Sequence, residues 1–143
     1  MSDNCHHIIK NETGPQEMIG YVLGVDKDNG HGRVWLDIAP QHLNRHGSLH
    51  GGIVGTLLDT ISGFTASLSF DEKGLTPCMS ISLNMNFIAG AREGRVVGSA
   101  KITGRGRTLF FIDAVLKNEE GVIIATSSGV FKAHRKPPTN MEN

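Results

Sequence analysis

Residues 52–70, GIVGTLLDTISGFTASLSF, decide the architecture of this 143-residue chain. Apolar side chains recur there at the three- and four-residue spacing of an amphipathic helix: Ile53, Val54, Leu57, Leu58, Ile61, Phe64 and Leu68. The polar run 71–74, which contains a glycine, follows directly and ends this pattern. We therefore predict one long helix from Gly52 to Phe70.

The period of the apolar pattern changes to two after this helix. Residues 79–87, MSISLNMNF, alternate between apolar and polar side chains, which is typical of a half-buried strand. Further strands are predicted over residues 21–26, 33–38, 96–103, 109–116 and 122–131, with a hairpin turn at residues 118–121. Six strands and one long helix predict an α+β fold, in which an antiparallel sheet covers the helix.

The two ends of the chain differ in composition from its body. Residues 1–15 are polar and contain Asn, Gly and Pro, which indicates a flexible N-terminal arm. Residues 133–143 are predicted to be a flexible C-terminal tail. No linker or internal repeat separates parts of the remaining sequence, so residues 16–132 are expected to form a single domain.

The charge balance restricts the partners of the chain. Fourteen basic residues face fourteen acidic residues, giving a formal net charge of zero. Nucleic-acid binding needs a basic excess, so we expect no nucleic-acid partner.

The polar N-terminus lacks the apolar core of a secretion signal, and no stretch approaches the ~20 apolar residues of a membrane span. These features predict a cytoplasmic protein that does not bind membranes.

The predicted sheet needs a second covering layer. A single helix cannot cover both faces of a six-stranded sheet, so the remaining face or an edge must meet water or another subunit. Because a chain of zero net charge repels its own copies little, we favour another copy of the chain as the cover.

Residues 44–52, NRHGSLHGG, hold the densest group of small and polar side chains. Gly51 and Gly52 at the start of the helix allow another group to approach the backbone closely. The N–H groups of a first helical turn have no intrahelical partner and can bind an oxygen that develops negative charge. Asn44 and His50 add polar side chains nearby in the sequence. This segment therefore predicts an anion-stabilising site.

Asp59 is an unusual residue for the middle of this apolar helix. Its helix face consists of small side chains: Gly55, Thr56, Ser62, Gly63 and Ala66. A carboxylate on such a face indicates that a strand, another subunit or a ligand packs closely against it. The alternative interpretation is a side chain that hydrogen-bonds a neighbouring backbone group.

The pattern Asn44-x-x-Gly47-x-Leu49-His50-Gly51-Gly52, followed by Leu58-Asp59, resembles the signature of the PaaI-type hotdog-fold acyl-CoA thioesterases. The resemblance extends over most of the chain, since residues 80–87 and 94–108 resemble the strands that follow the helix in that family. It implies a hotdog fold, in which a six-stranded antiparallel sheet wraps one long central helix. It also implies a homodimer or a dimer-of-dimers tetramer, with active sites between protomers.

The resemblance further implies a function. An acyl-CoA, of aryl or phenylacetyl type, would be hydrolysed to free acid and CoA without a cofactor or metal. The Gly51 N–H would polarise the thioester carbonyl, and Asp59 from the partner protomer would act as general base or nucleophile. Asn44 and His50 would orient water or thioester, and Ser80 matches a hydroxyl position beside the carboxylate.

Four residues are expected to contact the CoA part of the substrate by the same resemblance: Gly52, Gly106, Arg107 and Thr108. One departure concerns this part of the site. The family often has a proline soon after the strand that follows the helix, whereas this chain reads Ile88-Ala89-Gly90-Ala91. These residues border the CoA channel in relatives.

Two other functions stay open at this point. His50 and Asp59 also suit a hotdog-fold dehydratase or hydratase acting on acyl thioesters, and a non-catalytic acyl-CoA-binding module would keep the same fold.

A metal site is not predicted. His42, His46 and His50 are spaced four residues apart, but Pro40 and Gly47 argue against the continuous helix that would align them.

Overall fold

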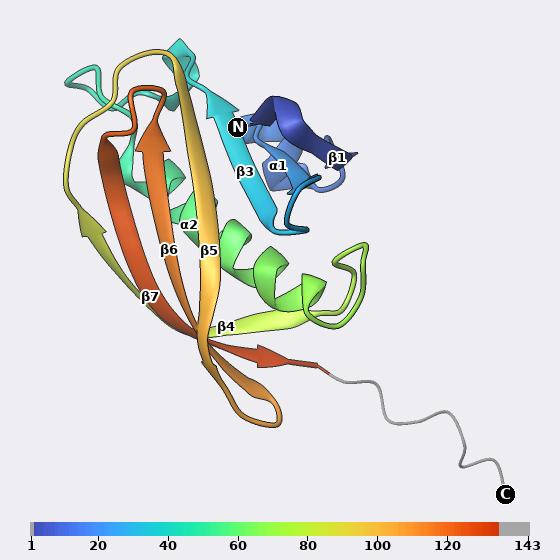
Figure 1. Cartoon of the computed structure of the whole chain (residues 1–143). Helices are drawn as coiled ribbons and strands as arrows, with labels where there is room; N and C mark the ends of the chain where they lie inside the picture. Colours follow the sequence, from blue (N-terminus) through green and yellow to red (C-terminus); the bar gives the residue numbers. More distant parts are fainter. Residues whose placement is uncertain (1, 135–143) are drawn as a thin grey trace, which may run out of the picture.

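Helix α2, Gly51–Leu68, is the centre of the computed structural model, which describes residues 2–134. The sheet curves around this helix (Figure 1). Leu57, Leu58 and Ile61 are completely buried between the helix and the sheet. The predicted long helix is confirmed, although it begins one residue earlier and ends two residues earlier than its apolar pattern indicated.

The sheet contains seven strands, each antiparallel to its neighbours. Their bounds are β1 Cys5–Ile9, β2 Val22–Asp26, β3 Gly32–Asp37, β4 Cys78–Phe87, β5 Arg95–Arg105, β6 Leu109–Asn118 and β7 Ile123–Ala133. The order across the sheet is β1-β2-β3-β5-β6-β7-β4, which leaves β1 and β4 at the two edges. All six predicted strands are present and the α+β class is confirmed, but the predicted strand number is one too low.

The additional strand lies in the segment that was predicted to be a flexible arm. There, a short 3₁₀ helix (η1, Ser2–Asn4) is followed by β1 and by helix α1, Gly14–Ile19. Strand β1 pairs with β2, and Thr13 caps α1 by accepting a hydrogen bond from the Gln16 N–H. The buried Gln16 amide donates to the carbonyls of Ile9 and Tyr21, at 2.8 and 3.1 Å. The prediction of a flexible arm is therefore wrong for the described residues of this segment.

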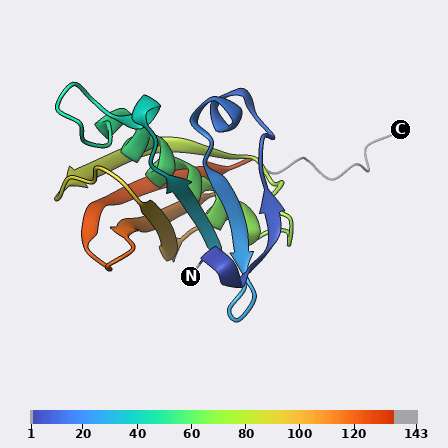
Figure 2. The same ribbon diagram turned by 90° about the horizontal axis from the view of Figure 1, so that it is seen from above.

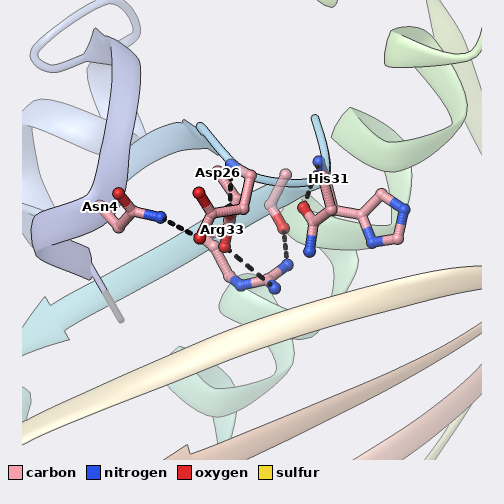
Figure 3. A network of polar contacts seen from close by, with 7 residues as sticks. Asn4, Asp26, His31 and Arg33 are labelled. Atoms are coloured by element: carbon pink, nitrogen blue, oxygen red, sulfur yellow. Dashed lines mark hydrogen bonds and ion pairs between the residues drawn. The ribbon is translucent and has the colours of Figure 1, made fainter.

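Polar contacts attach the N-terminal segment to the turn between β2 and β3. The Asn4 amide donates to Asp28 at 2.7 Å, and Arg33 forms an ion pair with Asp26 at 3.5 Å (Figure 3). The Asp28 N–H donates to the Asp26 carboxylate, which lowers the pKa of Asp26.

In the view from above, β1 to β3 lie on one side of α2 and β4 to β7 on the other (Figure 2). The helix is thus enclosed from both sides.

Strand β7 extends to Ala133, so the first residue of the predicted tail belongs to the sheet. Residues 135–143 of that tail lie outside the described residues.

Strand β4 contains a bulge that decides which of its side chains face α2. Ser80 lies opposite Phe131, and Ser82 lies opposite Val130, so Ile81 is an extra residue in the ladder. Ser80 therefore shares the helix-facing side of the strand with Leu83, Met85 and Phe87, although simple alternation would place it on the other side.

Candidate active site

The first turn of α2 leaves one backbone N–H group without a partner. His50 caps the helix, and its Nδ1 atom accepts a hydrogen bond from the Gly52 N–H at 2.9 Å. The N–H groups of Ile53 and Val54 donate to the His50 carbonyl. Within residues 2–134, no group accepts a hydrogen bond from the Gly51 N–H. Gly51 therefore supplies the free donor at the positive end of this helix.

The loop before the helix is organised by Asn44. Its Oδ1 atom accepts hydrogen bonds from the N–H groups of His46 and Ser48, at 2.9 and 3.1 Å. The Asn44 N–H donates to the Ser48 carbonyl at 2.8 Å, which closes the turn. Since the amide oxygen is occupied, the Asn44 NH₂ group is the part of the side chain left for a ligand.

A cavity of about 390 Å³ lies beside this first turn. Its lining is mainly apolar and includes Gly51, Val54 and Phe87. The Phe87 ring is 3.4 Å from the position that a Cβ atom of Gly51 would take. Residues 88–91 form another wall of this cavity.

A second cavity of about 400 Å³ opens beside Asp59 and Ser80. The Ser80 hydroxyl donates to Asp59 Oδ1 at 2.5 Å, across the contact between β4 and α2. Asp59 is half-buried and Ser80 is exposed. Among the hydrogen bonds of the described residues, none joins the Asp59 carboxylate to a backbone group. The alternative interpretation of Asp59 as a backbone-bonding residue is therefore wrong.

Asp59 and Gly51 do not face the same cavity in one chain. The two residues are eight positions apart on α2, which corresponds to about 12 Å along the helix axis. A thioester carbonyl is much smaller than this separation. The structure therefore brings Ser80 to Asp59, whereas His50 caps the first turn of α2 beside Gly51 and Asn44 holds the loop before it.

The residues predicted to bind CoA fall into two places. Gly52 lies in the first turn of α2, whereas residues 106–108 form the turn between β5 and β6. In that turn, the Gly106 N–H donates to the Leu109 carbonyl at 2.8 Å. The neighbouring Arg105 guanidinium lies over the Phe70 ring, 5.9 Å from its centroid, just beyond the C-terminal end of α2. One chain therefore does not bring this turn to the Gly51 end of the helix.

The histidine pattern of residues 42–50 has a structural explanation for its first member. His42 is buried in a 3₁₀ turn (η2, Pro40–His42), where Nδ1 accepts from the Ala39 N–H and Nε2 donates to the Ile19 carbonyl. Across the described part of the chain, no group of three or more His, Cys, Asp or Glu side chains could hold a metal ion.

No helix in residues 2–134 has the length and hydropathy needed to cross a membrane.

Sequence reasoning missed the N-terminal side chains that line the Asp59 cavity. Ile9, Glu12 and Thr13 form part of its wall, although the residues up to 15 were predicted to be a flexible arm. A signal for this structure was present in the sequence. Thr13 followed by Pro15 is a typical helix start, with a capping hydroxyl and a proline in the first turn.

Residues 46–125 match the family model of the thioesterase superfamily. Human acyl-coenzyme A thioesterase 13 is 30% identical over 130 residues, covering 87% of this chain and 91% of that protein. The mouse protein of the same name is 37% identical over 92 residues, 63% of this chain and 64% of that protein. The chain belongs to the thioesterase superfamily.

Solved structures share the fold. A Bacillus halodurans protein solved with CoA has a TM-score of 0.80 and 22% identity, over 90% of this chain and 83% of that chain. A thioesterase from Haemophilus influenzae has a TM-score of 0.79 and 18% identity, over 90% of this chain and 88% of that chain. The predictions of a hotdog fold and of a thioesterase enzyme are confirmed.

Proposed function

We propose that this thioesterase hydrolyses an acyl-CoA to a free acid and CoA, in sites built from two copies of the chain. The observation that carries the proposal is the pairing of a free helix-start N–H at Gly51 with an accessible carboxylate at Asp59. Hydrolysis of a thioester needs an oxyanion site and one carboxylate, because the thiolate is already a good leaving group. The family relationship to acyl-coenzyme A thioesterases supports the same substrate class.

In the proposed mechanism, the Gly51 N–H donates to the thioester carbonyl oxygen and stabilises the negative charge that develops there. Asp59 accepts a proton from water as the water oxygen attacks the carbonyl carbon. The carbon–sulfur bond then breaks, and the thiolate of CoA leaves and takes up a proton. A nucleophilic attack by Asp59 itself, followed by hydrolysis of the resulting anhydride, uses the same residues.

Three other side chains support these two groups in the proposal. Ser80 holds the Asp59 carboxylate through its hydroxyl group. Since Nδ1 of His50 accepts from Gly52, the neutral ring carries its proton on Nε2, which is free to donate to the thioester or to water. The Asn44 NH₂ group is a second donor of this kind.

A homodimer is part of the proposal because one chain keeps Gly51 and Asp59 about 12 Å apart. Strand β4 is an edge of the sheet and exposes apolar side chains, with Met79 at 57% and Ile81 at 52% exposure. An edge strand with exposed apolar groups is a suitable surface for pairing with a second copy. Such pairing would place the Asp59 half-site of one protomer beside the Gly51 half-site of the other.

The finer features of the substrate complete the proposal. We expect an acyl group of aryl or phenylacetyl type, and we assign the exposed turn of residues 106–108 to the CoA phosphates. Gly52 allows the pantetheine arm to approach the start of the helix closely.

The substitution Asp59→Asn tests the proposal. It removes the proton acceptor, or nucleophile, and keeps the shape of the side chain, so release of CoA from phenylacetyl-CoA should fall about 10²–10⁴-fold. A thiol-reactive dye measures this release directly. Asp113 offers a matched control, because it accepts a hydrogen bond from Ser128 at 2.8 Å on a different part of the sheet. Asp113→Asn should retain wild-type turnover, and equal turnover in Asp59→Asn would contradict the assignment.

A further inference from the structure

Two glycines of α2 differ in what surrounds them. A Cβ atom on Gly55 would lie 3.0 Å from Cε of Met85, so close packing against β4 explains the absence of a side chain there. A Cβ atom on Gly63 would meet nothing within 4 Å. Gly63 has no positive φ that would require glycine. Because glycine weakens a helix interior, the use of glycine at position 63 has no explanation in the packing of one chain.

The space above Gly63 belongs to the cavity beside Asp59. Asp59, Gly63 and Ser67 are spaced four residues apart on one face of α2, and all three line this cavity. Gly63 therefore lies about 6 Å along the helix axis from Asp59, and Ser67 lies about 12 Å from it. A group that extends from a carbonyl at Asp59 along the helix passes directly over Gly63.

We propose that Gly63 makes room for the acyl group and that this position sets the size of acyl group that the enzyme accepts. This inference rests on the proposed function, since it uses Asp59 as the reacting end of the cavity. The acyl group lies along the helix face: its first carbon lies near Asp59, a ring on a short linker lies over Gly63, and the far end of the cavity lies toward Ser67.

The part of the cavity around Ser67 is lined by hydrogen-bonded structure. The buried Ser67 hydroxyl donates to the Thr76 carbonyl, and the Cys78 thiol lies 3.7 Å from the same hydroxyl oxygen. Asp71 holds Thr76 in place by accepting from its N–H and hydroxyl groups, at 2.9 and 2.6 Å. The acyl group that fits is therefore compact, such as an aromatic ring on a short linker, rather than a long straight chain.

The outer wall of the cavity comes from a segment outside the family match. Ile9, Gln16, Tyr21 and Leu23 line the cavity, whereas the match to the family model covers residues 46–125. The reacting groups and Gly63 thus lie within the shared part of the chain, and the opposite wall lies outside it. This arrangement lets the wall fit a particular acyl group without changing the reacting groups.

Two substitutions at Gly63 test the inference. Gly63→Ala adds one methyl group in open space, and Gly63→Leu fills most of the path along the helix. Each residue favours the helix more than glycine does, so folding should be retained. We expect kcat/KM for phenylacetyl-CoA to fall about threefold in Gly63→Ala and at least tenfold in Gly63→Leu, because a side chain there occupies the volume of the ring. Turnover of acetyl-CoA should stay within about twofold of wild type in both variants.

A binding measurement separates this inference from the proposed function. The Asp59→Asn variant should bind the substrate without hydrolysing it. Calorimetric titration gives its Kd for phenylacetyl-CoA, which is compared with the Kd of the Asp59→Asn/Gly63→Leu double variant. A tenfold or larger weakening supports the inference even if no thioester is hydrolysed by the wild type, a result that would defeat the proposed function alone. Equal losses for acetyl-CoA and phenylacetyl-CoA would overturn the inference. Dissociation of the protomers by Gly63→Leu, measured by light scattering, would also overturn it by assigning the space to the partner subunit.

Discussion

The first turn and the middle of α2 have opposite characters. At the first turn, His50 and Asn44 use their acceptor atoms to hold nearby backbone N–H groups, and one donor, the Gly51 N–H, stays free. In the middle, Asp59 accepts a single hydrogen bond from Ser80 and borders an open cavity over Gly63. The first turn thus holds its backbone N–H groups in hydrogen bonds around one free donor, whereas the middle combines a half-buried carboxylate with open space.

This difference matches two separate requirements of catalysis. Stabilisation of an oxyanion depends on a donor that is already in place before the charge develops. Selection among acyl groups depends on the shape of a cavity, which can vary while the donor stays fixed. In the proposed function, the two halves of α2 supply these two requirements separately, so substitutions in one half should leave the requirement met by the other half unaltered.

At the first turn, the largest effect should come from removing the free donor alone. Gly51→Pro deletes the N–H group, and proline is favourable at the first position of a helix. The preceding residue, His50, already has the extended backbone that proline requires of its neighbour, with φ −62° and ψ 134°. We expect thermal stability to be retained and kcat to fall about 10²–10³-fold. Gly51→Ala keeps the N–H group and should lose little activity; equal losses in both variants would assign the effect to crowding near Phe87.

The same variant tests whether the two halves come from different protomers. In a mixed dimer of Asp59→Asn and Gly51→Pro chains, one of the two shared sites has both groups intact. Random mixing of the two inactive variants, after unfolding and refolding together, should therefore restore about a quarter of wild-type activity. A mixture that stays inactive, although light scattering shows dimers, would assign both groups to sites within single chains.

A smaller effect is expected from the hydroxyl group that holds Asp59. Ser80→Ala removes one hydrogen bond to a half-buried carboxylate, and kcat should fall about tenfold, as for loss of one charge-assisted bond. Ser80→Thr retains a hydroxyl group and should recover part of the rate. The matched control is Ser128→Ala, which removes the corresponding bond to Asp113 and should leave kcat unchanged.

The smallest effect concerns the loop that lines the far end of the middle cavity. Hydrogen bonds from the Thr76 hydroxyl and from backbone N–H groups lower the pKa of Asp71 from 3.8 to about 2. Since the pKa is lower in the folded state, the ionised group stabilises the fold above about pH 4, and this contribution is lost as the pH falls toward 2. Asp71→Asn should therefore show a shallower decrease of Tm between pH 5 and pH 2 than the wild type. A parallel decrease in both proteins would contradict this linkage.

The sequence predicted those parts of the fold that depend on local periodicity. The helix face at Leu57, Leu58 and Ile61 repeats at the helical period, and its burial follows from that pattern. The N-terminal strand was missed because β1 is only five residues long and its polar and apolar side chains do not alternate. Its stability comes from pairing with β2 and from the buried amide of Gln16, which are contacts between distant residues.

The candidate site was predicted in a different way. The residue pattern singled out Gly51 and Asp59, and the resemblance supplied their roles and Ser80. Periodicity alone would have turned Ser80 away from the helix. The bulge at Ile81 arises from the pairing of β4 with β7, which no pattern within β4 reveals. The open space over Gly63 was also beyond prediction, because it depends on the positions of the N-terminal wall and of the loop that includes residues 73–77.

The bulge has a consequence for how relatives should be compared. Ile81 acts as a spacer between two halves of β4 that are out of phase, so a homologue lacking this one residue would form a regular ladder with its serine still toward the helix. A one-residue gap in an alignment at this point therefore leaves the serine hydroxyl in place. Counting positions from the end of the strand would instead pair Ser80 with a side chain on the outer face, and the serine of such a homologue would be overlooked.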